Sequence, residues 1–199
     1  MLSLTLFHGN TRKAIDEIIS LQYFPEKFKS TGDTHYLGDG FYFYRDPVQA
    51  EVWARMKVNR NTTYKGEDWA VLKCRVSIEE EQFLDLDNRE EQNFFFSEMI
   101  RLYEQLKARN LKLIEYSDAY LCNLIASITG VQVIAKTFPY VDREEVFSPK
   151  FSNEKVPPYS ITRHFRTEKQ YVVRNSSLID SYDIVKTGRS RYRKRGVAK

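Results

Sequence analysis

Hydrophobic and polar positions alternate at the start of the chain and then change to helical spacing. The segment LSLTLFHG places its leucines two residues apart, which predicts a strand over 2–9. Residues 11–21 place their apolar side chains on one helical face, and either Asn10 or Thr11 stands where a capping side chain is needed. The chain is therefore expected to begin with a strand followed by an amphipathic helix.

A polar loop over 22–38 separates this unit from the segment GDGFYFYRDP. The run FYFY predicts a short strand over 41–44. Asp46 followed by Pro47 is typical of the first two positions of a helix, because Asp caps free N–H groups and Pro needs none. A loop as long as 22–38 in a compact domain is usually functional or mobile.

The rest of the pattern predicts further strands and helices. Strands are expected over 68–78, 83–86 and 131–138, helices over about 89–109 and 117–129, and strand-like segments over 160–165, 169–175 and 177–185. Asn88 is the expected cap of the first of these helices, with Glu91 at the capping-box position. Strands lead the N-terminal half, helices form an insert, and strands dominate the last third. This order predicts an α+β fold with a mixed sheet.

Composition supports one globular domain in a reducing compartment. Hydrophobic residues make up 42% of the 199 residues and aromatic residues 14%, which excludes wholesale disorder. Cys74 and Cys122 both lie in apolar stretches, so we expect buried free thiols. Three dispersed histidines without a CxxC pair predict no metal site. No signal peptide and no apolar run of membrane-spanning length is present, so a cytoplasmic protein without membrane contact is expected.

Basic charge is concentrated at the C-terminus. Residues 186–199 carry seven Lys/Arg and no Asp/Glu, whereas the rest of the chain has more acidic than basic residues. The sequence thus divides into a single domain over 1–185 and a basic tail over 186–199. The tail residues considered for nucleic-acid binding are Arg191, Arg193, Lys194 and Arg195. A solvated terminus without a partner is an equally open interpretation.

A small set of residues fits the chemistry of NAD cleavage. The nicotinamide ring of NAD is cationic, so aromatic side chains bind it by stacking and cation–π attraction. Tyr42, behind a turn that ends at Gly40, and Trp53, eleven residues later, are the candidate stacking pair. His8-Gly9 ends the first strand, where glycine allows a ligand to approach the main chain. Each signal alone is more often a packing feature.

In combination, these residues resemble the ADP-ribosyltransferase superfamily, in the His-Tyr-Glu branch that includes diphtheria toxin and the poly-ADP-ribose polymerases. The first motif of that branch is matched by His8-Gly9-Asn10 and the second by GDGFYF over 38–43. The third, a Glu-Tyr-x-Val strand, is matched in position by QYVV over 170–173. The three motifs keep the order of the family.

The resemblance implies NAD as co-substrate and a role for each matched residue. His8 would bind the adenosine ribose and Gly9 the nicotinamide amide, while Tyr42 and Trp53 would sandwich the ring. Trp53 is expected to face the cleft and to share a helix face with Ala50 and Ala54. Asn10 would replace a family hydroxyl. The 22–38 loop falls where the family has its donor loop.

The catalytic glutamate of the family is replaced by Gln170. A glutamine carbonyl accepts a hydrogen bond but brings no charge to stabilise the developing oxocarbenium ion. Three explanations stay open: the enzyme tolerates Gln, Glu168 on the same strand face takes over part of the role, or the chain is an inactivated form. A solvated Glu168 is a further alternative.

The leading hypothesis is an intracellular mono-ADP-ribosyltransferase that acts as a toxin or an antiviral defence effector. A neutralising antitoxin protein is a partner expected by analogy. The acceptor is a nucleic acid (RNA or DNA) or a protein, with the basic tail slightly favouring nucleic acid. Arg163 and Arg166 are further candidate contacts for nucleic acid, and ordinary surface positions are their alternative. The competing hypothesis is a catalytically silent module that binds NAD, ADP-ribose or nucleic acid.

Overall fold

A computed structural model of the protein describes residues 1–32, 34–109, 117–139 and 167–191. The expected strand over 160–165 lies outside these residues. So do five of the candidate nucleic-acid contacts: Arg163, Arg166, Arg193, Lys194 and Arg195. Within the described ranges, none of the helices combines the length and the apolar character that a membrane span requires.

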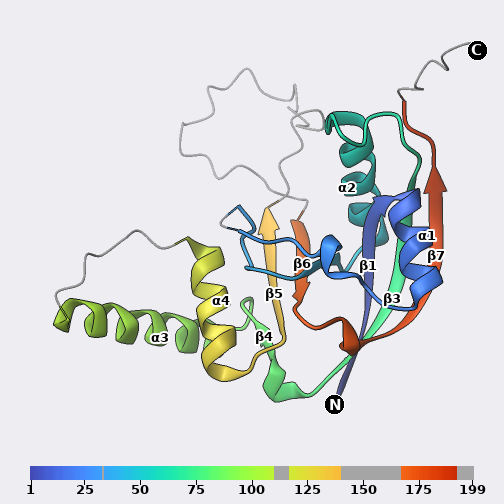
Figure 1. Ribbon diagram of the computed structural model, residues 1–199. Coiled ribbons are helices and arrows are strands. Elements are labelled where there is room, and N and C mark those ends of the chain that lie inside the picture. The colour runs from blue at the N-terminus through green and yellow to red at the C-terminus, as the bar shows by residue number, and fades with distance from the viewer. Residues whose placement is uncertain (33, 110–116, 140–166, 192–199) are drawn as a thin grey trace, which may run out of the picture.

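The described residues form a mixed sheet with helices on both faces (Figure 1). The strands are β1 (Leu2–Thr11), β2 (Phe41–Tyr44), β3 (Trp69–Ile78), β4 (Phe83–Asp85), β5 (Val133–Pro139), β6 (Thr167–Val173) and β7 (Ile179–Gly188). The helices are α1 (Arg12–Leu21), α2 (Pro47–Arg60), α3 (Arg89–Ala108) and α4 (Asp118–Thr129), with short 3-10 turns at Glu26–Phe28, Glu80–Gln82 and Ser176–Leu178. The predicted α+β class is thereby confirmed.

The sheet consists of two halves that meet at a narrow joint. Its strand order is β4-β5-β6-β2-β1-β3-β7, and every neighbouring pair is antiparallel except β4 with β5. The β1–β3 ladder runs from Leu2 to Thr11, whereas β1 and β2 pair only through Phe7 and Tyr44. The two strands diverge beyond that pair, and the sheet opens between them.

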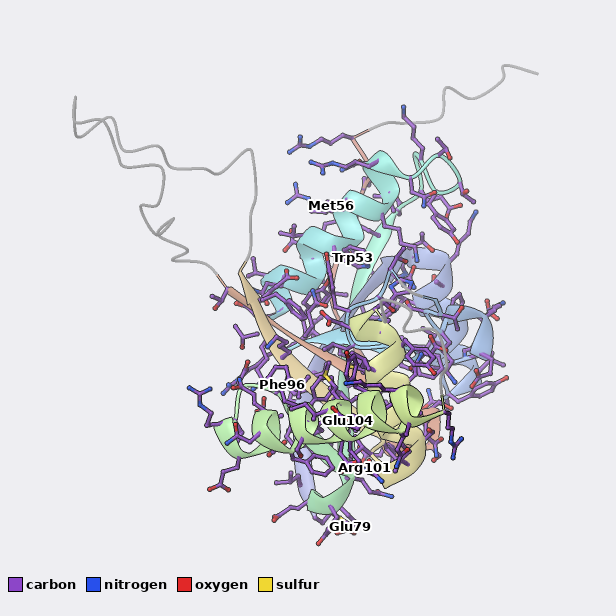
Figure 2. All side chains as sticks on the ribbon, turned by 90° about the vertical axis from the view of Figure 1, so that its left-hand side faces the viewer. Trp53, Met56, Glu79, Phe96, Arg101 and Glu104 are labelled. Atoms are coloured by element: carbon purple, nitrogen blue, oxygen red, sulfur yellow. The ribbon has the colours of Figure 1, made fainter. Side chains whose placement is uncertain are left out.

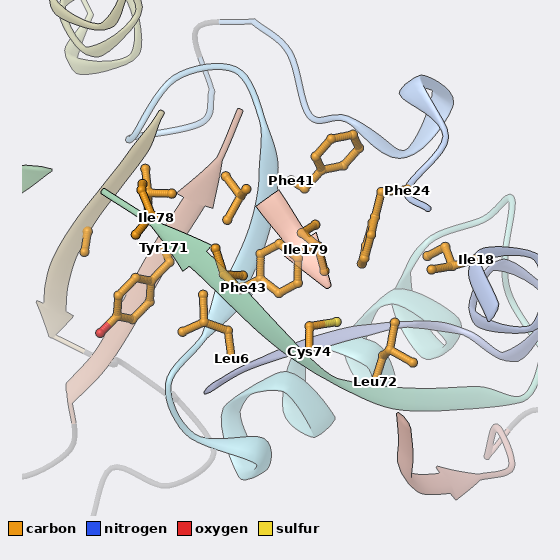
Figure 3. Packing of buried hydrophobic residues seen from close by; sticks show 14 of the residues in the cluster. Leu6, Ile18, Phe24, Phe41, Phe43, Leu72, Cys74, Ile78, Tyr171 and Ile179 are labelled. Carbon is orange, nitrogen blue, oxygen red and sulfur yellow. The ribbon is translucent and has the colours of Figure 1, made fainter. Parts of the chain in front are cut away.

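One face of the sheet carries the main hydrophobic core, which α1 covers. Ile15 and Ile18 of this helix pack with Leu6, Phe24 and Phe43, all of them nearly inaccessible to solvent. Figure 3 shows this packing, in which residues of both sheet halves join one cluster. The apolar alternation of the first strand therefore continues into a core shared by the whole sheet.

The opposite face is covered by two different helices. On α2, Ala50, Ala54 and Val58 pack against Tyr44 and Val71 of the sheet. On the other half of the sheet, α4 forms a second cluster with strand residues of β4, β5 and β6. The face between α2 and α4 is the one on which the candidate site lies.

Both cysteines are free and buried, as their apolar flanks predicted. Cys74 lies on β3 within the main core, and Cys122 lies on α4. Burial raises the pKa of both thiols, that of Cys122 to about 12. At neutral pH both therefore remain protonated and unreactive.

Helix starts follow the predicted capping residues, and at α3 the side chain of Asn88 accepts from Glu90 N at 2.8 Å. The hydroxyl of Thr11 accepts from Ala14 N at 3.3 Å, and the carboxylate of Asp46 accepts from Val48 N at 2.7 Å. The prediction that Glu91 completes a capping box with Asn88 is wrong. Asn88 N already donates to Asp85 O at 2.8 Å, and the Glu91 carboxylate accepts instead from Asp85 N.

The strand β7 extends into the segment assigned to the basic tail. It ends at Gly188, and Lys186 pairs with Val71 in the β3–β7 ladder. The ammonium of Lys186 also donates to Glu51 of α2 at 3.1 Å. The first three residues of the predicted tail thus belong to the sheet, and only residues after Gly188 extend beyond it.

Candidate functional site

The three sequence motifs lie on three neighbouring strands, β6, β2 and β1. Tyr44 connects them, because it pairs with Phe7 of β1 on one side and with Gln170 of β6 on the other. Strand alternation places Tyr42, Tyr44, Gln170 and Glu168 on the face between α2 and α4. The second and third motifs therefore meet on one surface, whereas the His8 ring of the first motif lies against Phe24 and Phe43 of the main core on the opposite face.

His8 bridges the opening between β1 and β2. Its Nδ1 lies 2.8 Å from the carbonyl oxygen of Tyr42, and the amide nitrogen of Asn10 lies 3.2 Å from its Nε2. Burial lowers the pKa of His8 to about 4, so the ring is neutral at pH 7. A neutral ring that accepts from Asn10 at Nε2 carries its proton on Nδ1, where it donates to Tyr42. The side chain thus replaces ladder hydrogen bonds that the diverging strands have lost.

Gly9 has a packing role in the fold. A Cβ atom at this position would lie 1.9 Å from the carbonyl oxygen of Ala50 and 3.1 Å from Cβ of Ala54. The absence of a side chain therefore lets α2 pack directly against β1. Contact of Gly9 with a nicotinamide amide stays a prediction.

Tyr42 is fixed by its hydroxyl group. The hydroxyl donates to Gly38 O at 2.9 Å and accepts from Leu37 N at 3.1 Å. Burial raises the pKa of this phenol, so it stays protonated. The ring of His35 lies 5.6 Å from the Tyr42 ring, centroid to centroid. One side of the candidate stacking platform is thus approached by the loop before β2.

The turn before Tyr42 is anchored to α4 by residues that the sequence did not single out. Asn123 Oδ1 accepts from Asp39 N at 2.7 Å and from Arg174 Nη1 at 2.8 Å. Arg174 Nη2 donates to Leu37 O at 3.3 Å. Arg174 directly follows the QYVV motif, which was a usable signal. Asn123 had no such signal, because its contacts are far away in sequence.

Gly40 allows close strand packing at the end of this turn. A Cβ atom here would lie 2.4 Å from Cγ2 of Val172 and 2.8 Å from the carbonyl oxygen of Val173. Gly40 N and O also pair with Ser30 O and N in an isolated bridge. The glycine is required by the β2–β6 contact, and its role in cofactor binding stays a prediction.

Trp53 does not share the buried face of α2 with Ala50 and Ala54. Both alanines are fully buried, whereas 47% of Trp53 (labelled in Figure 2) is exposed. At 100° per residue, Trp53 lies next to the face formed by Ala50 and Ala54. Only small side chains such as those of the two alanines fit where α2 packs against β1. Among the described residues no ring contact joins it to Tyr42, so the stacking pair stays a prediction.

Glu168 and Gln170 form a hydrogen-bonded pair on one face of β6, as the alternation predicted. The amide of Gln170 donates to the carboxylate of Glu168. Burial raises the pKa of Glu168, against the opposing effect of this hydrogen bond. Glu168 is therefore a half-buried carboxylate held next to Gln170, and it is not a plain solvated charge.

The start of α2 lies beside this pair. Gln49 Nε2 donates to Thr167 O at 2.5 Å, and Arg45 N donates to Lys169 O at 3.2 Å. On the other face of β6, the ammonium of Lys169 forms ion pairs with Asp85 and Asp87 at 2.6 and 2.9 Å. The positive charge between Glu168 and Gln170 in sequence is thus neutralised away from the site.

Two pockets in the described part of the chain lie elsewhere. A small one lies between α3 and α4, and one of about 220 Å³ is lined by residues at the start of α1, the start of β3 and the end of β7. Neither is lined by Tyr42, Trp53 or Gln170. No group of three or more His, Cys, Asp or Glu side chains among the described residues is placed to hold a metal ion.

Comparison with known proteins gives no family assignment. The sequence matches no family model. It is 29% identical over 197 residues to the uncharacterized protein MJ0359 of Methanocaldococcus jannaschii, an alignment that covers 92% of this chain and 89% of the archaeal protein. The two chains are thus similar over nearly their whole length.

Proposed function

We propose that this protein is a NAD-cleaving mono-ADP-ribosyltransferase that modifies a macromolecular acceptor. The observation that carries the proposal is the strand order β6-β2-β1, which brings the His-Gly, Tyr and Gln motifs onto adjacent strands. In the reaction, the bond between nicotinamide and C1′ of the ribose breaks, and nicotinamide leaves with the electron pair. The acceptor oxygen or nitrogen then bonds to C1′ and releases its proton.

Each residue of the candidate site has its own role in this reaction. Neutral His8 is held between β1 and β2 by Asn10 and by the carbonyl oxygen of Tyr42, and its role is to bind the adenosine ribose. Tyr42 and Trp53 supply aromatic faces for the cationic nicotinamide. Glu168, held by Gln170, supplies the negative charge that stabilises the oxocarbenium ion. The pair therefore performs the role that a single glutamate has in the family that the motifs resemble.

A catalytically silent NAD or ADP-ribose binding module is the second candidate. It is favoured by the amide at position 170, which places no charge of its own at the third motif. Release of nicotinamide separates the two functions, because only an enzyme produces it.

The experiment uses labelled NAD with the purified protein, alone and with cell extract treated with protease or nuclease. Glu168→Gln should lower NAD consumption by about 10²-fold, while Gln170→Glu should raise it. Gln105→Glu on α3 is the matched control and should change nothing. The fraction that carries the label identifies the acceptor class. Loss of labelling after nuclease treatment of the extract identifies RNA or DNA as the acceptor.

No nicotinamide release by any of these variants would contradict the enzyme proposal, and measured NAD binding would then favour the silent module. If the protein acts as a toxin or defence effector, its expression should arrest growth of a host cell. Glu168→Gln should remove that effect, and co-expression of a neutralising partner should suppress it. Growth arrest that persists with Glu168→Gln would contradict a catalytic origin.

A further inference from the structure

The ends of three strands meet the start of α1 and the end of α2 at one edge of the molecule. Trp69, the first residue of β3, pairs with Thr11 of β1 and with Gly188 of β7. Beyond β7, Arg191 N donates to Asn59 Oδ1 of α2 at 3.2 Å. The end of β7 therefore lies beside α2, as Figure 1 also shows.

A pocket of about 220 Å³ opens between these ends. Its lining residues are Arg12, Asp68, Trp69, Thr187, Gly188 and Arg189. A Cβ atom at Gly188 would lie 2.3 Å from the Trp69 indole, so the glycine lets the indole pack against the backbone of β7. The lining of the pocket thus combines an indole packed on the strand with two arginines and one carboxylate, that of Asp68.

The positive charges here exceed their carboxylate partners. Arg12 donates from Nε to Asp16 Oδ1 at 2.7 Å, and among the described residues no other carboxylate forms an ion pair with its guanidinium. Arg189 and Arg191 are exposed. Lys57 bonds Asn10 Oδ1 at 2.8 Å and lies 4.9 Å over the Tyr64 ring. It forms no ion pair with a carboxylate in the described part of the chain.

We propose that this basic end, consisting of Arg12, Lys57, Arg189 and Arg191, binds the sugar-phosphate backbone of a nucleic acid. Arginine guanidinium groups match phosphate geometry, and a cluster in which cations outnumber the carboxylates attracts a polyanion. The sequence adds more basic residues directly after Arg191 and no acidic ones. Phosphate contacts of this kind position a strand without reading its sequence.

The basic end is connected to the candidate NAD site by hydrogen bonds. Asn10 accepts from Lys57 through Oδ1 and donates through Nδ2 to His8, which in turn donates to Tyr42 O. A strand bound at the basic end would therefore lie next to the side chains that surround NAD. The inference deepens the proposed function, because it names nucleic acid as the acceptor class, and it rests on that function for the transfer step only.

Binding is measured by fluorescence anisotropy with labelled single-stranded RNA and DNA and with an acidic poly-Glu peptide, over a series of salt concentrations. The double variant Arg12→Gln/Arg189→Gln should lose about tenfold in affinity for nucleic acid. The slope of log K against log salt should fall by about 1.4 if two phosphate contacts disappear. Arg101→Gln on α3 (Figure 2), the match for Arg189→Gln alone, removes one positive charge elsewhere and should change neither quantity. A chain that ends at Arg191 should bind more weakly than the full chain but retain the effect of the double variant.

Unchanged affinity in the double variant, or tighter binding of the acidic peptide than of RNA and DNA, would overturn the proposal. Arg189→Gln alone, on an exposed side chain after the last strand, keeps the test valid if the double variant does not fold. The assay contains no NAD. Nucleic-acid binding without nicotinamide release would therefore contradict the proposed enzymatic activity, while it would still support nucleic-acid binding at the basic end.

Discussion

His8 shows how one residue of the candidate site serves the fold. The β1–β2 ladder ends after the pair of Phe7 and Tyr44, so the carbonyl of Tyr42 has no strand partner from β1. An unpaired buried carbonyl is costly, and His8 satisfies it through Nδ1. The same bond fixes the ring against Phe24 and Phe43 of the main core. The fold alone therefore accounts for this histidine, and its contact with a ribose stays a prediction.

The buried state of His8 predicts a pH dependence of stability. Its pKa is lowered to about 4 from the ordinary 6.5, so the unfolded chain binds more protons between these values. The stabilisation that comes from burying His8 in its neutral form is fully present above pH 6.5. It is lost as pH falls through 4. Between pH 7 and 4 this residue should lower the free energy of unfolding by about 3 kcal/mol. Urea unfolding at several pH values measures it.

The control for this prediction is His8→Asn, which keeps an N–H donor for Tyr42 O but does not titrate. Carboxylates such as Asp87 also titrate in acid, and they do so in both proteins. The difference between the two pH profiles therefore belongs to His8. Parallel profiles would show that the imidazole is charged in the folded state or accessible to protons.

Gly9 predicts a large effect from one added methyl group. In Gly9→Ala, the new Cβ meets the carbonyl oxygen of Ala50 at 1.9 Å, and helix backbone cannot move away without separating α2 from β1. We expect a loss of about 3 kcal/mol in the free energy of unfolding. Gly130→Ala is the comparison, because no atom lies within 4 Å of its Cβ and only the positive φ of 79° opposes it. It should cost about 1 kcal/mol. Equal losses in urea unfolding would contradict the packing role of Gly9.

The candidate site was predictable from sequence to the extent that local periodicity controls it. Alternation along a strand placed Glu168 and Gln170 on one face, and their hydrogen bond confirms this. Spacing placed Trp53 next to Ala50 and Ala54, but it could not show that only the two alanines are buried against the sheet. Arg174 and Asn123 act on the turn before Tyr42 through tertiary contacts that no local pattern contains.

At the scale of elements, capping residues predicted helix starts better than spacing predicted element ends. Asp46 and Pro47 begin α2 as expected, because the Asp carboxylate satisfies a free N–H group locally. The Glu91 prediction failed because Asp85, which precedes the cap, already bonds Asn88 N. The end of β7 was predicted too early, since its last residues are polar but pair with β3.

Substitutions on the two faces of α3 should change the free energy of unfolding by very different amounts. Phe95 is 7% exposed and packs in the cluster formed with α4, whereas its neighbour Phe96 is 56% exposed (Figure 2). Phe95→Ala should lower the free energy of unfolding by about 3 kcal/mol, because it leaves a cavity. Phe96→Ala should change it by less than about 0.5 kcal/mol. Chemical unfolding of both variants is the measurement, and a large loss with Phe96→Ala would mean that this face of α3 is covered in solution.

At the scale of the whole molecule, strand order was not predictable. The sequence indicated strands and helices in series, but β1 lies between β2 and β3 while β6 inserts between β2 and β5. Such pairings depend on long-range burial, and local patterns do not encode which strands pair. The candidate site depends on this order, since residues of β1, β2 and β6 contribute to it.

The two-part sheet predicts different accessibility for the two buried thiols. Cys74 lies on β3 between β1 and β7, so exposing it requires opening of the longest ladders in the sheet. Cys122 lies on α4, where its thiol contacts Tyr36 O at 3.7 Å, and release of one helix exposes it. Because local opening needs less free energy than global unfolding, Cys122 should react at least about tenfold faster in the native state.

The test is alkylation under native conditions followed by mass spectrometry, with labelling in denaturant as the control. In denaturant both thiols lose the burial that raises their pKa, so they should react at similar rates. The native rate of Cys74 should follow global unfolding across a urea series, whereas that of Cys122 should depend less on urea. Equal native rates with equal urea dependence would show that α4 and the β1–β3–β7 half open together. The sheet would then behave as one cooperative unit despite its narrow joint at Phe7 and Tyr44.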